Sequence, residues 1–138
     1  METSWGPDIT AAIELAMGLA LVLGTILARQ RCYRAHAWCQ AAVVVLNLWV
    51  IAACMVPVFH RKVAVALSAG TLSTHYLLAA VHGAAGLMAE LLAVYILLVA
   101  GTSIVPHRLR FSDYKFWMRT VLALWWLALL LGLAVYMS

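Results

Sequence analysis

Long apolar runs divide the sequence into four segments, and short stretches that carry charges separate them. Each run has the ~20 mostly apolar residues that a helix needs to cross a bilayer at a rise of ~1.5 Å per residue. The runs are residues 9–28, 38–59, 74–100 and 117–137. They are too long for barrel strands and do not alternate, and backbone groups in lipid must be paired within their own segment. The pattern therefore predicts a single all-α transmembrane domain over residues 1–138.

Composition excludes the soluble classes of protein. The chain of 138 residues is 67% hydrophobic and only 10% charged, which is too little polar surface to cover a soluble domain. The start, METSWGPDIT, lacks the basic region of a cleavable signal, so we expect the first run to remain as a membrane helix.

Seven of the nine basic residues lie at two of the connections, so the net charge of +4 does not indicate a nucleic-acid partner. These residues flank the first and third connections: Arg29, Arg31, Arg34, Arg108, Arg110, Lys115 and Arg119. The positive-inside rule places both connections in the cytoplasm, with both termini outside. Short connections favour antiparallel neighbours, so we expect an up-down four-helix bundle.

Polar residues form one stripe on each of three predicted helices when placed at 100° per residue. The stripes comprise Glu14 and Thr25; His36, Gln40, Asn47 and Cys54; and His75, His82 and Glu90. Polar groups in a span usually face the bundle interior, because lipid would leave them unpaired. We expect the stripes to meet there, with Glu14, Glu90 and Asn47 as the polar interior.

Small residues recur every four positions on the first predicted helix, at Ala12, Ala16, Ala20 and Gly24. Such spacing allows another helix to approach closely, and the stripe begins on the face opposite Glu14. It favours self-association or contact with other membrane subunits. Alanine is common in spans, however, so the spacing is equally consistent with chance.

Histidines are the main candidates for cofactor binding. His60 and His75 are expected at the outer edge, and His82 lies roughly 10 Å deeper along its helix. Neutral imidazole ligates many metals and is the usual axial ligand of haem in membrane bundles. Haem b or copper are the candidate groups, with Gly83 and Gly86 leaving room for a porphyrin beside His82. The alternative is that His82 makes only a hydrogen bond.

Two carboxylates, Glu14 and Glu90, lie within the predicted spans. Glu14 and Glu90 would each cost a few kcal/mol as ions in the bilayer, a cost that protonation avoids. They are consistent with proton coupling, with support of a histidine N–H, or with a neutral acid bonded to Asn47 or Thr25. The sequence contains no nucleophile triad, phosphate loop or paired hydrolase carboxylates, so we do not expect an enzyme.

Several motifs together resemble the domain-of-unknown-function 420 family. They are "RAHAW", "PVFH", a histidine-containing third helix and the last helix "YKFWMRTVLALWWLALLLGLAVYM". The resemblance implies a small four-helix protein of the bacterial inner membrane, linked to the biogenesis of haem–copper oxidases. That family usually has a further histidine just before the last helix, where this chain has Tyr114 and Lys115. Small multidrug resistance transporters are similar in length, in their four spans and in a first-helix glutamate, but their other motifs are absent.

Three functions are consistent with these residues. The first is an accessory or assembly subunit of a respiratory or electron-transfer complex that holds haem b or copper through His82, His75 and His60. The second is a small proton-coupled transporter that uses Glu14 or Glu90. The third is a purely structural subunit of a larger membrane complex, in one variant with a pigment ligated by His82.

Overall fold

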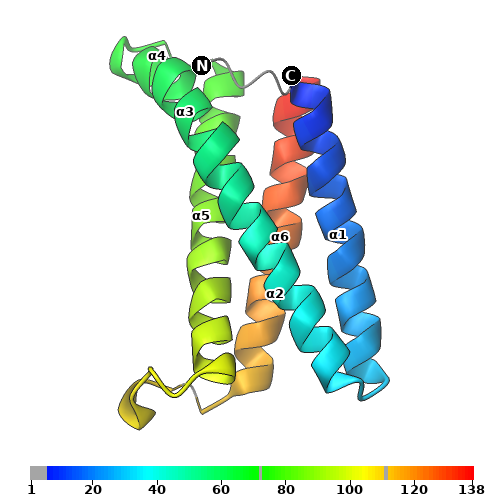
Figure 1. Ribbon diagram of the computed structural model, residues 1–138. Helices are drawn as coiled ribbons and strands as arrows, with labels where there is room; N and C mark the ends of the chain where they lie inside the picture. Colours follow the sequence, from blue (N-terminus) through cyan, green and yellow to red (C-terminus); the bar gives the residue numbers. More distant parts are fainter. Residues whose placement is uncertain (1–5, 72, 111) are drawn as a thin grey trace.

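The computed structural model describes residues 6–71, 73–110 and 112–138, and these form long helices with short connections (Figure 1). The long elements are α1 (Pro7–Arg29), a continuous helical stretch over Tyr33–Ser68, α5 (Thr74–Gly101) and α6 (Tyr114–Met137). Each of these four is long and apolar enough to cross a membrane. The all-α prediction with four potential spans is confirmed, and three of the predicted runs match their helices to within three residues at each end.

The second helix is longer than the sequence predicted. It begins at Tyr33 and ends at Ser68, so the predicted run over residues 38–59 is too short at both ends, by nine residues at the second. The stretch comprises α2 (Tyr33–Val50), the π-helical η1 (Ile51–Met55), α3 (Val56–Val58), the π-helical η2 (Phe59–Ala64) and α4 (Val65–Ser68).

Pro57 lies between these two π-helical segments and does not end the helix. Proline has no backbone N–H to donate, which disturbs the α-helical ladder of hydrogen bonds, and π-helical turns are a rare variation that occurs inside α-helices. Arg61 supports the turn because its Nε donates to the Pro57 carbonyl oxygen at 3.2 Å. The helix ends at Ser68, and Gly70, with a φ of 73°, adopts the left-handed conformation in the turn that follows α4.

Capping side chains mark where the next two long helices begin. The Ser73 hydroxyl accepts a hydrogen bond from the Tyr76 backbone N–H at 3.4 Å, and the Asp113 carboxylate accepts one from Phe116 at 3.1 Å. Each cap satisfies one of the backbone donors that the first turn of a helix leaves unpaired. A short 3₁₀ helix, η3 (His107–Leu109), lies in the connection between α5 and α6.

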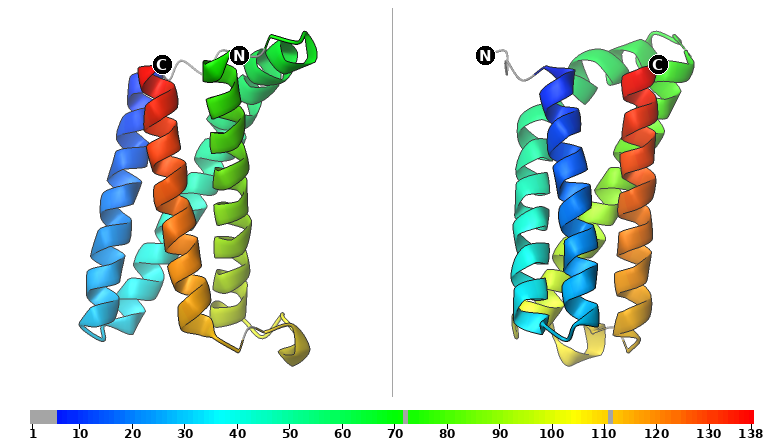
Figure 2. Two further views of the ribbon diagram at one scale, coloured as in Figure 1. Left: turned by 180° about the vertical axis from the view of Figure 1, so that it is seen from behind. Right: turned by 90° about the vertical axis from the view of Figure 1, so that its right-hand side faces the viewer.

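The long helices run alternately in opposite directions, and the two ends of the molecule differ in character (Figures 1 and 2). The start of α1 and the end of α6 lie at one end, here called the termini end, while the end of α1 and the connection after α5 lie at the other, the basic end. α1 packs on α2 and α6, and α5 packs on α6. The second helix crosses diagonally, from α1 at the basic end to α5 at the termini end (Figure 1).

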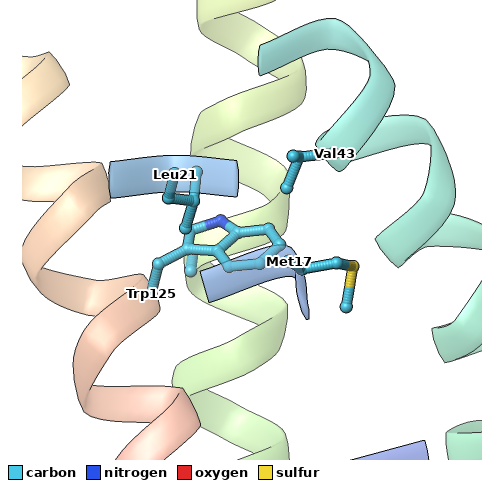
Figure 3. Packing of buried hydrophobic residues seen from close by; sticks show 5 residues of the cluster. Met17, Leu21, Val43 and Trp125 are labelled. Carbon is cyan, nitrogen blue, oxygen red and sulfur yellow. The ribbon is translucent and has the colours of Figure 1, made fainter. Parts of the chain in front are cut away.

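One compact cluster of buried apolar side chains joins all four long helices. Its members are Met17, Leu21, Val43, Ala89 and Trp125, and Figure 3 shows how they pack. The Trp125 indole lies against Met17 and Leu21 of α1 (Figure 3). This cluster also forms part of the wall of the candidate site described below.

Candidate functional site

A cavity of about 1170 Å³ lies beside the core cluster, in the half of the molecule toward the termini end. Met17, Ala89 and Trp125 belong to both the core cluster and the cavity wall. The predicted site residues that also line the cavity are Glu14, Asn47, His60, His75 and His82. The cavity is slightly larger than the ~300–1000 Å³ typical of small-molecule sites. Tertiary structure thus brings together most of the side chains that the sequence singled out.

Glu14 of α1 and His82 of α5 meet over a glycine of α6. A Cβ atom at Gly132 would lie 2.9 Å from both the Glu14 Oε2 and the His82 Cε1 atoms, and 3.3 Å from His82 Nδ1. The carboxyl and the imidazole are close enough to interact electrostatically. Only the absence of a side chain at Gly132 lets both groups approach the α6 backbone. Sequence reasoning missed Gly132, whose only signal is that it interrupts an apolar helix.

A backbone hydrogen bond holds the His82 ring. Its Nδ1 lies 2.8 Å from the carbonyl oxygen of Ala128, and a carbonyl oxygen can only accept. Nδ1 therefore carries the proton, and in the neutral ring Nε2 is left with a lone pair. Within the described part of the chain, no hydrogen bond engages Nε2. This is the arrangement found at metal-ligating histidines, where a bond from one nitrogen orients the ring for the other.

His60 and His75 lie at the rim of the cavity, where both are exposed. The His75 Nδ1 is 2.8 Å from the Ser138 hydroxyl, which ties the start of α5 to the end of α6. The His60 ring packs edge-on beside Phe59. The described residues contain no group of three or more histidine, cysteine or acidic side chains that could hold a metal ion. The three predicted ligands therefore share a cavity without forming a ligand cluster.

A second polar pair lies deeper, between α2 and α5. The Asn47 amide Nδ2 donates a hydrogen bond of 2.7 Å to Glu90 Oε2. Asn47 also lines the cavity, whereas Glu90 lies behind it with only 1% of its surface exposed. The three predicted stripes do converge, but in two separate pairs, with Glu14 near His82 and Asn47 bonded to Glu90.

Polar groups nearer the basic end join α1 to α2 and lie away from the cavity. His36 Nδ1 is 2.8 Å from the Gly24 carbonyl oxygen, and the Cys39 thiol donates to the Ala20 carbonyl oxygen at 3.3 Å. Gly24 belongs to the predicted small-residue stripe and is buried against α2 within the chain itself. Ala12 and Ala16 of the same stripe are exposed.

Comparison with known protein families, curated proteins and solved structures finds no match. The resemblance to the domain-of-unknown-function 420 family therefore stays a prediction. Function has to be argued from the cavity and its side chains.

Proposed function

We propose that this chain is a small accessory or assembly subunit of a respiratory or electron-transfer complex, and that it holds haem b in the cavity through His82. The observation that carries the proposal is the orientation of the His82 ring. Its Nδ1 proton is engaged by Ala128, so the Nε2 lone pair of a cavity-lining residue is free to ligate iron.

The cavity residues fit a haem better than copper. The volume of about 1170 Å³ and the absence of side chains at Gly83 and Gly86 leave room for a flat macrocycle beside the imidazole. Copper sites draw on several protein ligands, and the described residues provide no group of three. Bound haem would supply one-electron chemistry, and this chain would hold it through His82 in a largely apolar surrounding. His60, which lies on a different helix from His82, would be the candidate for a second ligand.

The distribution of charge supports an orientation for the subunit. The basic end carries Arg29 and the connection of η3, so under the positive-inside rule it faces the cytoplasm. In this arrangement the cavity, the bundle's termini end and both chain ends face outward, in the inner membrane of a bacterium. The exposed small residues Ala12 and Ala16 leave one face of α1 for a neighbouring subunit or a second copy.

An absorption spectrum with iron and copper analysis of the protein purified in mild detergent tests this proposal. We expect a Soret band in the wild type that is lost in His82→Gln. A matched control is His107→Gln, because His107 is an exposed histidine outside the cavity wall, and it should keep the band. Fully inserted protein from haem-supplied cells with neither a Soret band nor bound iron would refute the haem site.

One observation favours a second candidate function, a small proton-coupled transporter. Glu14 faces His82 inside a cavity, and a carboxyl beside an imidazole can pass a proton between them or release it when a cationic substrate binds. Proton flux into proteoliposomes, followed with a trapped pH dye, tests this reading. Glu14→Gln should abolish the flux, and an unchanged flux in that variant excludes Glu14 as the proton site.

A further inference from the structure

Glu90 is a buried acid that neither the haem site nor the Glu14–His82 pair uses. It lies eight residues beyond His82 on α5, or roughly 12 Å along the helix, and is 1% exposed. Its Oε2 accepts the hydrogen bond from Asn47, but its Oε1 has no hydrogen-bond partner among the described residues. Half of this carboxyl is therefore unsatisfied in the middle of the bundle.

Neither protonation state satisfies that oxygen with the surrounding protein alone. As a carboxylate, Glu90 would need donors on both oxygens and receives one, inside a region where a lone charge is costly. As a neutral acid, Glu90 can accept from Asn47 through Oε2 as its carbonyl oxygen, so Oε1 becomes the hydroxyl and needs an acceptor. Buried polar atoms in native proteins almost always have a protein or water partner.

Access to this oxygen is available from the cavity side. Asn47 lines the cavity, and so do Gly86, Leu87 and Ala89 from the turn of α5 that precedes Glu90. Gly86 leaves open space there, because a Cβ atom added to it would meet nothing within 4 Å. The Asn47 side chain that bonds the Glu90 carboxyl is therefore itself part of the cavity wall.

Other charged groups do not compensate for Glu90. Two ionisable residues of the cavity wall, Glu14 of α1 and His82 of α5, lie close to each other over Gly132. Asn47 is the interacting side chain on α2, and α6 contributes Trp125 and Ala128 to this part of the cavity wall.

We propose that Glu90 is a proton-binding site, and that its Oε1 together with Asn47 binds a buried water through which the acid exchanges its proton with the cavity. The proton leaves the Glu90 hydroxyl for the water oxygen and returns by the same route, and no other bond changes. This site is independent of the haem site, because it needs neither His82 nor a bound cofactor.

Infrared spectroscopy of the purified protein tests the site directly. The carbonyl stretching band of a protonated carboxylic acid should be present in the wild type and lost in Glu90→Gln. It should persist in Glu14→Gln and in His82→Gln, so that failure of the haem proposal leaves this readout intact. Absence of the band from the wild type, or its loss in Glu14→Gln alone, would overturn the assignment to Glu90.

The rate at which this band shifts after transfer to D₂O tests the route to the cavity. Asn47→Leu removes the polar partner of the water and should slow the exchange by about tenfold or more. Gly86→Leu fills the cavity side of the site while keeping the Asn47 hydrogen bond, so it gives a second test if Asn47→Leu does not fold. Exchange as fast as in the wild type in the folded variants would show that the proton does not travel by way of the cavity.

Discussion

Replacing Gly132 with alanine perturbs the cavity at the point where three helices meet. The added Cβ atom would lie 2.9 Å from both Glu14 Oε2 and His82 Cε1, closer than carbon atoms normally approach either group. The Glu14 side chain is flexible and can swing away. The His82 ring is held by its 2.8 Å bond to Ala128, so it moves only by straining that bond.

The magnitude follows from comparison with a second glycine on the same cavity. A Cβ atom on Gly86 meets nothing within 4 Å. Glycine-to-alanine changes in a helix gain up to about 1 kcal/mol from backbone propensity, and this gain is common to both positions. Overpacking costs about 1–3 kcal/mol. We therefore expect Gly132→Ala to be about 1–3 kcal/mol less stable than Gly86→Ala.

The assay is unfolding by SDS in mild detergent, followed by the helical circular dichroism signal. Combining Gly132→Ala with Glu14→Ala removes one of the two crowded groups and should recover part of the loss, which identifies the clash as its cause. Identical unfolding of Gly132→Ala and Gly86→Ala would refute the placement of Glu14 and His82 over Gly132.

Further expectations concern other contacts. Asn47→Val and Glu90→Leu should each lower the unfolding free energy by about 1–3 kcal/mol, because each leaves a buried polar partner unpaired. The double variant should recover most of the loss, and a loss in the same SDS assay equal to the sum of the two single losses would contradict the bond. In a variant without Cys39 and Cys54, a membrane-impermeant maleimide should label the exposed Cys32 only after cells are permeabilised, and labelling of intact cells would reverse the proposed orientation. Arg31→Gly should raise the unfolding free energy by about 1 kcal/mol, because Arg31 has a φ of 60° in the turn after α1; an unchanged midpoint would argue against that conformation.

The helices were predictable because their signals are local. Length and apolarity define a span residue by residue, and Ser73 and Asp113 cap α5 and α6 through backbone groups only three positions away. The second helix was misjudged because His60, Arg61 and Lys62 were interpreted as the start of a loop. The helix instead continues past these residues through two π-helical segments on either side of Pro57. Those segments depend on the pattern of backbone hydrogen bonds, which composition does not reveal.

The sequence predicted which residues belong to the candidate site better than it predicted which of them contact one another. A polar residue within an apolar run stands out by type alone, which is why Glu14, Asn47, His82 and Glu90 were identified. Placing the residues at 100° each along their helices also predicted that these side chains face inward. Which of them meet depends on the crossing of the second helix and on the height at which each helix packs, and those are properties of the assembled bundle.

The sequence by itself determined that this protein is all-helical with four helices able to span a membrane, and that its interior polar residues are few. Hydrophobic length and the need to pair backbone groups in lipid are sufficient to require this. Only the tertiary structure decided that Glu14 faces His82 across Gly132 and that Asn47 bonds Glu90. It also decided that His60, His75 and His82 line one cavity without forming a ligand cluster among the described residues. The physical reason is that a helix sets which face a residue occupies, whereas the packing of small residues between helices sets which faces touch.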